Sequence, residues 1–545
     1  MRFVSVDEMR AMDKFAIDEY QINSYDLMER AGKGVATVIG EFINSYNIQQ
    51  CRRAVIFAGK NNNGGDAYVV ARHLAHLIAD IEIVIYCIGA IDDLKGDCYT
   101  NAQIIAKDFN EIIINEIKDV NAINLCNGDV IIDGLLGTGV HGSLREPYLS
   151  LVHLINQQNL LTIAIDLPTG MNGDNGLPCG YQFIDVDFEN ITRLPIVNAD
   201  LTVTIGAPKW GMISHVGAEY CGQIRFVDIG LEYFDNATEN EMIFASDLVN
   251  YFQRRSVYNH KNSVGKVLTI AGSKHYQGAA FLGAIASLKS GAGFVDLAVP
   301  KSANIVNNSN VHSVIVHQIK DNGCGTFSKE SIAHLAPIIE KVNAVNVGSG
   351  ISTNLDNIAV LEYLRDKVEN KAIIYDADAL NLIAKDISLL AIENNKNINI
   401  LTPHVGEMNR LLKAFNLSEH LEQSRITQAN ILAKKTQAIV VLKGHHTITA
   451  LPSGTFFINS SGNIALATAG TGDCLAGIIT SFLAKEISND FTRVQDYKNY
   501  LRAVANAVFV HGYCADIYPF AKSGFIADDL LDLLPVALRE ISPFA

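Results

Sequence analysis

A run of small residues from Asn463 to Gly472 (NIALATAGTG) leads to an acid, Asp473, directly before an apolar segment. This pattern predicts the first turn of a helix, where unpaired backbone N–H groups can neutralise a phosphoryl group during its transfer. Asp473 would then accept the proton of an attacking hydroxyl. The alternative is that Asp473 is an ordinary helix cap, although such caps rarely bring the whole A-T-A-G-T-G-D string.

Two further segments of the second half end apolar runs with polar side chains. Lys443 to Thr447 (KGHHT) follows the run IVVL and offers a cation and hydrogen-bond donors suited to a nucleotide phosphate. His404, in the segment TPHVGE, follows the run INIL and is expected at the same edge of a sheet. An exposed lysine at a strand end and a structural histidine are the alternatives at these positions.

Three loops rich in small residues follow apolar runs in the first half of the chain: residues 60–66 (KNNNGGD), 134–142 (GLLGTGVHG) and 167–170 (LPTG). Free backbone N–H groups in such loops can receive phosphate. Asn63, Asp133 and Thr169 offer the oxygen ligands that a hard cation prefers. Asp166 is the carboxylate best placed for proton transfer. Helix capping remains the alternative for Asp66, Asp133 and Asp166.

These loops require strands that end at a common edge. Apolar runs such as AVIFAG, EIVIYCIG and TIAID alternate with helical segments, which is typical of a parallel sheet covered on both faces. The first half is therefore expected to be a Rossmann-like doubly wound α/β domain, preceded by amphipathic helices within residues 7–39. A polar segment, residues 228–263, connects this domain to a second, different α/β series that starts near residue 264. The domain boundary is placed within this segment, between residues 236 and 237.

Composition excludes several classes of protein. The 545 residues are 48% hydrophobic and 19% charged, which is typical of a globular chain with large cores. The net charge of −15 without Lys/Arg-rich runs argues against nucleic-acid or anionic-membrane binding. The nine scattered cysteines form no C-x-x-C pair, so neither a disulfide framework nor a zinc site is indicated. The acidic N-terminal segment and the lack of a long apolar run predict a cytoplasmic protein with no membrane span.

The segments NNGGD, DGLLGTGVHGS, DLPTG and TVTIGAPKWG resemble the NAD(P)H-hydrate epimerase domain over residues 1 to about 235. The resemblance implies interconversion of the R and S hydrates of NADH and NADPH, with Asp166 as a catalytic residue. It implies a potassium site at Asn63, Asp133 and Thr169. The implied substrate contacts are Asn62, Asn63, Gly64, Gly65, Asp66, Gly137, Thr138, Gly139, Val140, His141, Gly142, Ser143 and Asp166. Asn61 and Ala67 stand where the family usually has Gly.

The second half resembles the ribokinase-like superfamily and within it the ADP- or ATP-dependent NAD(P)H-hydrate dehydratase. The segments that carry the resemblance are AGSKHYQGAA, DADALN, TPHVGE and KGHHT, together with the segment that ends in Asp473. This resemblance, over roughly residues 245–545, implies a ribokinase-like α/β/α sandwich. It implies that Gly350, His404 and Asp473 contact the hydrated nicotinamide, with Asp473 catalytic. The implied nucleotide contacts are Lys443, Gly444, His445, His446, Thr447, Asn463, Thr468, Ala469, Gly470, Thr471 and Gly472. Magnesium would accompany the nucleotide, and the loop VGSGIS departs from the more Gly/Pro-rich form of the family.

The sequence thus predicts a bifunctional repair enzyme, both isomerase and lyase. Residues 1–236 would epimerise the hydrate, and residues 237–545 would dehydrate the S form through a phosphorylated intermediate. ADP is favoured over ATP as donor, and the resemblance implies a homo-oligomer, possibly a tetramer. Two alternatives stay open. One is a ribokinase-like vitamin or sugar kinase with an appended domain, and the other is a first domain that only binds dinucleotides or proteins.

Overall fold

The computed structural model describes residues 1–45, 53–78, 80–140, 142–182, 193–214, 216–233, 240–252, 254, 264–305, 311–390, 396–421, 423–489 and 497–545. The predicted substrate contact His141 and the predicted domain boundary between residues 236 and 237 lie outside these residues. The chain divides into two compact units, Met1–Glu239 and Asn240–Ala545. Each unit has its own sheet.

Seven parallel strands form the sheet of the first unit, in the order β3-β2-β1-β4-β5-β6-β7. The strands are β1 (Arg53–Ala58), β2 (Glu82–Cys87), β3 (Ile113–Glu116), β4 (Asp129–Gly134), β5 (Leu161–Ile165), β6 (Leu201–Ile205) and β7 (Gln223–Val227). The direction of winding reverses between β1 and β4. In open parallel sheets such a switch point, at the carboxyl ends of the strands, is where ligands bind.

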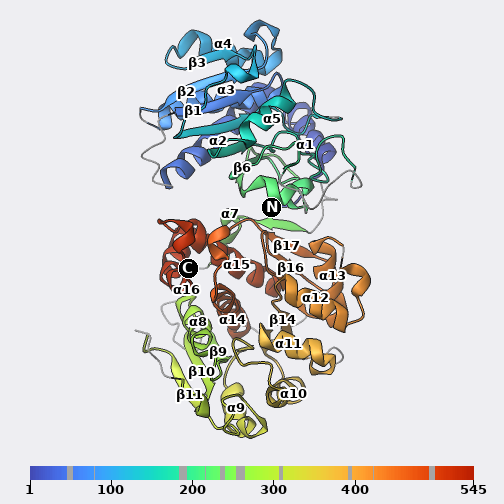
Figure 1. The fold of residues 1–545 in the computed structure, drawn as a ribbon, viewed down its shortest axis with the longest axis vertical. Helices are drawn as coiled ribbons and strands as arrows, with labels where there is room; N and C mark the ends of the chain where they lie inside the picture. The colour runs from blue at the N-terminus through green and yellow to red at the C-terminus, as the bar shows by residue number, and fades with distance from the viewer. Residues whose placement is uncertain are drawn as a thin grey trace. The chain divides into compact units, whose positions relative to one another are not determined.

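Helices cover both faces of this sheet (Figure 1). Their bounds are α1 (Val6–Asp18), α2 (Ser24–Ser45), α3 (Asn62–Leu77), α4 (Gly96–Asp108), α5 (Tyr148–Asn156) and α6 (Gly217–Cys221). Alternate residues of β1 enter two cores, because successive strand residues point to opposite faces. Ala54 and Ile56 pack with α2, α3 and α4, whereas Val55 and Phe57 pack with α5. The predicted doubly wound sheet and N-terminal helices are confirmed.

The second unit contains a ten-stranded sheet in the order β11-β10-β9-β12-β13-β14-β15-β16-β17-β8. The strands are β8 (Glu241–Ile243), β9 (Lys266–Ile270), β10 (Phe294–Pro300), β11 (Ile315–Ile319), β12 (Ala344–Val347), β13 (Ala372–Tyr375), β14 (Ile398–Leu401), β15 (Ile439–Leu442), β16 (Ile448–Ala450) and β17 (Phe456–Asn459). All neighbours are parallel except the pairs β15–β16 and β16–β17. The segment expected only to connect the domains thus supplies an edge strand, β8.

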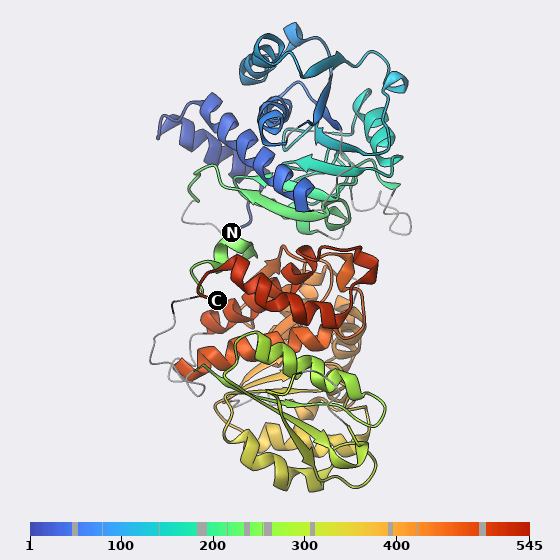
Figure 2. The same cartoon turned by 90° about the vertical axis from the view of Figure 1, so that its left-hand side faces the viewer.

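Figure 2 shows helices on both faces of this second sheet. They are α7 (Ala245–Leu248), α8 (Gln277–Lys289), α9 (Ile332–Ile339), α10 (Ile358–Lys367), α11 (Asp378–Lys385), α12 (Val405–Ala414), α13 (Arg425–Thr436), α14 (Thr471–Asn489), α15 (Tyr497–Asp516) and α16 (Ala527–Ile541). Buried residues of α8, α14, α15 and α16 share one core with β9 and β10. The predicted class, two different α/β domains with layered helices and sheet, is confirmed.

None of the helices in the described part of the chain is long and apolar enough to cross a bilayer.

Candidate active sites

The first candidate site lies at the switch point of the first sheet. Gly59, which follows β1, donates its N–H to the carbonyl of Gly134 at the end of β4 (3.0 Å). The first turn of α3 approaches this edge so closely that a Cβ atom on Gly64 would lie 1.9 Å from the carbonyl oxygen of Gly59. Only glycine fits at that contact. The loops after β1 and β4 therefore meet at this edge of the sheet.

A cavity of about 750 Å³ opens at this edge. The predicted contacts that line it are Asn62, Asn63, Asp66, Gly137, Thr138, Gly139, Val140, Ser143 and Asp166. Gly64 and Gly65 are buried in the first turn of α3 beside it and are not among the lining residues. Gly142, which has a φ of +80°, is likewise not among them. The structure thus brings together most of the residues that the sequence assigned to one site.

The three predicted cation ligands lie beside the cavity. Thr169 donates both its backbone N–H (2.8 Å) and its hydroxyl (2.7 Å) to the carboxyl of Asp133, which is fully buried. Burial raises the pKa of Asp133 to about 6. Asn63 is 7% exposed, and both polar atoms of its amide lack a hydrogen-bond partner in the structure. The buried, unpartnered amide oxygen of Asn63, the carboxylate of Asp133 and the hydroxyl of Thr169 are the kinds of ligand that a hard cation prefers.

Asp166 follows β5 with a φ of +65°, a strained conformation for a residue with a side chain. Its carboxyl accepts the N–H of Ile205 (3.2 Å) and pairs with the ammonium group of Lys209. Lys209 is only 1% exposed and also donates to the hydroxyl of Thr204 (3.2 Å) and the carbonyl of Ile205 (2.8 Å). Asp166 is thus a fixed carboxylate at the cavity wall, held by a buried cation.

Sequence reasoning missed Lys209 and Asp13, which line the same cavity. Lys209 stands in the quoted segment TVTIGAPKWG just after β6, so its place at the carboxyl edge of the sheet was a usable signal. Asp13 lies on α1 and carries no such signal. Burial raises the pKa of Asp13 to about 6, and the charge of Asp166 adds to this effect while that of Lys209 opposes it.

The second candidate site lies at the beginning of α14. The ammonium group of Lys443 donates to Asp376 (2.8 Å), whose carboxyl also accepts the hydroxyl of Thr402 (2.7 Å). A Cβ atom on Gly472 would lie 3.5 Å from this ammonium nitrogen, so the lysine lies against the first turn of α14. Burial disfavours the charged form of Lys443, but Asp376 and Glu407 outweigh it and raise its pKa. A cation and a helix N-terminus thus share one anion-binding position.

Asp473 stands in the same first turn of α14. Burial raises its pKa to about 7, with a further contribution from the charge of Asp376. The nearby hydroxyl of Ser349 and the charge of Lys443 act in the opposite direction. A carboxyl group whose pKa lies near neutrality is well matched to taking a proton from a hydroxyl at physiological pH.

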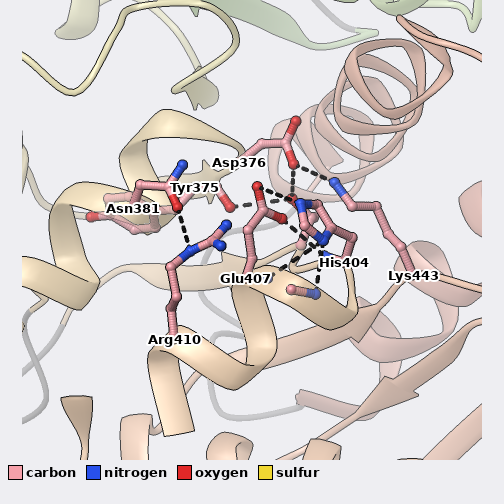
Figure 3. Close-up of polar contacts among 9 residues, drawn as sticks. Tyr375, Asp376, Asn381, His404, Glu407, Arg410 and Lys443 are labelled. Atoms are coloured by element: carbon pink, nitrogen blue, oxygen red, sulfur yellow. Dashed lines mark hydrogen bonds and ion pairs between the residues drawn. The ribbon is translucent and has the colours of Figure 1, made fainter. Parts of the chain in front are cut away.

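His404 precedes α12 and caps it, as Figure 3 shows together with the Asp376–Lys443 pair. Its Nδ1 accepts the N–H groups of Gly406 (2.9 Å) and Glu407 (3.4 Å). Burial and the charge of Lys443 lower the pKa of this imidazole. In the neutral ring the proton therefore sits on Nε2, which lies 3.5 Å from a carboxyl oxygen of Glu407 on a half-exposed ring.

The loops after β9 and β12 meet at the switch point of the second sheet, because Gly272 donates its N–H to the carbonyl of Ser349 (2.8 Å). Gly350 has a φ of +63° and touches Tyr276, where a Cβ atom would lie 2.7 Å from the tyrosine Cβ. His511, on α15, contacts the carbonyl of Thr471 (2.9 Å) through Nε2. Asp376, Ser349 and His511 were not predicted from the sequence, although Asp376 begins the segment DADALN at the end of β13.

The remaining predicted nucleotide contacts form two loops. Gly444, His445, His446 and Thr447 join β15 to β16, and Thr447 donates its hydroxyl to the carbonyl of Gly444 (3.0 Å). Thr468, Ala469 and Gly470 lead into α14. The side chain of Asn463 is engaged internally with Ala465, Ala515 and Asp516 (2.9–3.0 Å), so only its backbone could serve a ligand. In the described ranges no cluster of three or more His, Cys, Asp or Glu residues is arranged to hold a metal ion.

The two units match different protein families. Residues 24–211 match the family described as YjeF-related protein N-terminus, and residues 267–535 match the family described as NAD(P)H-hydrate dehydratase. Bifunctional NAD(P)H-hydrate repair enzyme Nnr from Moorella thermoacetica is 31% identical, with 99% of this chain and 97% of that protein covered. The protein of the same name from Thermofilum pendens is 31% identical with the same coverage. A solved structure of the ADP/ATP-dependent NAD(P)H-hydrate dehydratase from Bacillus subtilis, co-crystallized with ATP and Mg²⁺, is 26% identical, covers 54% of this chain and 97% of its own, and has a TM-score of 0.44.

Proposed function

This chain belongs to the family of bifunctional NAD(P)H-hydrate repair enzymes, with isomerase and lyase activities, and on that premise we propose which unit performs each step. Residues 1–236 epimerise the R and S hydrates of NADH and NADPH. Residues 237–545 dehydrate the S hydrate with consumption of a nucleoside phosphate. This assignment rests on the two family matches, which fall on different units. Each match lies within one unit and includes the predicted site residues of that unit.

In the first unit, we propose that the cavity between the loops after β1 and β4 binds the hydrated dinucleotide. Asp166 takes part in proton transfer at the hydrated ring, held in place by the ammonium group of Lys209. Asn63, Asp133 and Thr169 would hold a potassium ion. The buried amide of Asn63 supports this proposal, because its oxygen has no hydrogen-bond partner and could coordinate the ion. Bound there, the cation would supply positive charge next to the substrate.

In the second unit, we propose that Asp473 removes the proton of the C6 hydroxyl as its oxygen attacks the terminal phosphorus of the nucleotide. The bond to the leaving nucleotide oxygen breaks, and a C6 phosphate ester forms. The C6–O bond then breaks, phosphate departs with the bonding electrons, and loss of a proton from C5 restores the dihydronicotinamide. Lys443 and the N–H groups of α14 stabilise the transferring phosphoryl group.

Magnesium would bind in this unit mainly through the nucleotide phosphates and water, and would neutralise phosphate charge. Lys443 to Thr447 and the backbone from Asn463 to Gly472 would hold the nucleotide, and Gly350 and His404 would contact the substrate ring. On the resemblance to fused microbial enzymes we further propose ADP as donor, a homo-oligomeric assembly, possibly a tetramer, and a cytoplasmic location.

The test is the return of dihydronicotinamide absorbance at 340 nm when the purified protein meets a mixture of NADH-hydrate epimers with Mg²⁺, K⁺ and either ADP or ATP. Full recovery with one nucleotide supports both activities and identifies the donor. In Asp166→Asn we expect recovery to stop when the S form is consumed and the R form to remain. Equal consumption of both epimers by that variant would contradict the division of labour. A stable phosphorylated product with no recovery would instead favour a small-molecule kinase.

A further inference from the structure

Helix α1 forms one wall of the cavity in the first unit and lies before the matched range 24–211. Its residues at the cavity are Met9, Arg10, Asp13 and Ile17. The helix begins with a capping box, in which Ser5 and Glu8 exchange side-chain-to-backbone hydrogen bonds (2.6 and 3.1 Å). Met9 and Met12 are buried against Ala207 on the inner side of the helix.

Contacts at two points fix this wall relative to the cavity. Val4 donates its N–H to the carbonyl of Pro208 (3.0 Å), and Phe3 stacks on Trp210, with ring centroids 4.8 Å apart. Both contacts flank Lys209. On the other side, the guanidinium of Arg10 donates to the carbonyl of Thr138 (3.0 Å), in the predicted substrate loop. The position of Asp13, one turn further along the helix, is therefore determined relative to both Lys209 and this loop.

Charged residues from several segments line the cavity together with Asp13. The charged residues that line the cavity besides Asp13 are Arg10, Asp66, Asp97, Arg145, Asp166 and Lys209. Asp166 and Lys209 are close enough to influence the ionisation of Asp13 directly. Since Asp166 pairs with the buried ammonium group, the negative charge at this position is already balanced by Lys209. Burial raises the pKa of Asp13 to about 6, so a fraction of the molecules carries a protonated Asp13 carboxyl group near neutral pH.

Epimerisation at C6 requires both an acid and a base. The carbon carries a hydroxyl and the ring nitrogen N1, and is therefore a hemiaminal. When a base removes the hydroxyl proton, the C6=O bond forms, the C6–N1 bond breaks, and the electron pair on N1 takes a proton from an acid. Rotation of the open aldehyde, followed by attack of N1 on its other face, inverts C6 and returns both protons. No oxidant or reductant is required.

We propose that Asp13 is the second acid–base residue of this site, with Asp166 as the base and Asp13 as the acid that protonates N1 on ring opening. The two exchange roles on ring closure. Lys209 is the positioning residue that holds the carboxyl group of Asp166 in place. This inference rests on the proposed epimerase function of the first unit and adds to it a residue from outside the matched range.

The test compares Asp13→Asn with Asp18→Asn, which alters an exposed acid at the end of the same helix, in the full-length protein. Consumption of purified R-NADH hydrate is followed in the presence of Mg²⁺ and nucleotide, and consumption of the S form is measured separately. We expect kcat for the R form to fall about 100-fold or more in Asp13→Asn, because general acid catalysis contributes about 10²–10⁴-fold. The rate with the S form should stay unchanged, and Asp18→Asn should behave as wild type in both assays.

The pH profile separates chemistry from structure. An acid acts in its protonated form, so in wild type kcat/KM for the R form should decline at high pH, and Asp13→Asn should lose this decline. Asp13→Glu, which retains the carboxyl group, should keep it at a lower rate. If kcat and the profile of Asp13→Asn match those of wild type, or if only KM rises, the inference is overturned while the epimerase function stands. If wild type itself leaves the R form unconsumed, the proposed function fails and the inference with it.

Discussion

Asp473 in the second site differs from an ordinary surface acid in its burial and in its charged neighbours. Asp473 is partly buried next to Asp376, which raises its pKa to about 7, whereas Lys443 limits the rise. A base works only in its ionised form. Dehydration of the S hydrate should therefore accelerate as pH rises through about 7 and level off above it.

Asp473→Asn should lower kcat for this step by about 10²–10⁴-fold and remove the pH dependence, because the amide cannot accept the proton. Initial rates at 340 nm with the S form and nucleotide across this pH range test the prediction. Epimerisation of the R form by the same variant is the internal control. If the dehydration rate of the variant still rises with pH near 7, Asp473 is excluded as the titrating base.

Lys209 allows a stability prediction at the same scale. Its ammonium group is buried, and its removal would leave Asp166 uncompensated next to Asp13 and Asp66. Breaking a buried pair from one side costs about 3–5 kcal/mol. We expect Lys209→Met to lower the free energy of unfolding of the first unit by this amount, measured by urea titration.

The double variant Lys209→Met/Asp166→Asn is the matched control, since it removes both charges and should recover part of the loss. If the double variant loses as much free energy of unfolding as the two single variants added together, the interaction between Lys209 and Asp166 contributes nothing to stability.

At the scale of elements, the strands and their loops could be predicted, because period and turn residues are local features of the chain. The apolar runs became parallel strands, and the loops after them converge at the sheet edges. Asp13 could not be found this way, because its position follows from the packing of α1 against residues 207–210. Strand β8 was missed for the same reason: Glu241–Ile243 lies in a polar segment and becomes a strand only by pairing with β17.

The contact between α8 and α14 gives a prediction at this scale. Gly477 lies so close to α8 that a Cβ atom would be 2.1 Å from the carbonyl oxygen of Gly283. The hydroxyl of Ser287 also donates to the carbonyl of Gly477 (2.8 Å). We expect Gly477→Ala to force the helices apart and to destabilise the second unit by about 1–3 kcal/mol, as overpacking does. Denaturant titration measures the change.

Gly278→Ala is the control on the same pair of helices, because a Cβ atom there meets nothing within 4 Å and the residue is exposed. Alanine is the better helix former, so this variant should be as stable as wild type or more stable by about 0.5–1 kcal/mol. Equal stability of Gly477→Ala and Gly278→Ala would contradict the close contact.

For the whole molecule, the division into units with separate sheets has a thermodynamic consequence. A ligand stabilises the folded state that binds it, by about 2.7 kcal/mol at a concentration 100 times its Kd. We expect calorimetry to resolve two unfolding transitions, and ADP with Mg²⁺ to raise the temperature of only one. The same experiment on Gly477→Ala identifies that transition, since the variant lowers it without ligand. A single transition that shifts as a whole would contradict the prediction.

The pairing of β8 with β17 also bears on how the protein is made. Asn240 and Phe456, which are 216 residues apart, are joined by a hydrogen bond (3.0 Å) at the start of this strand pair. A ribosome adds about 5–20 residues per second, so β8 waits roughly 10–40 s for its partner to be synthesised. During that interval the first unit already has all seven strands of its own sheet. The nascent chain therefore carries one sheet whose strands are all present and one strand still without its neighbour, and the second sheet can be completed only after β17 has been synthesised.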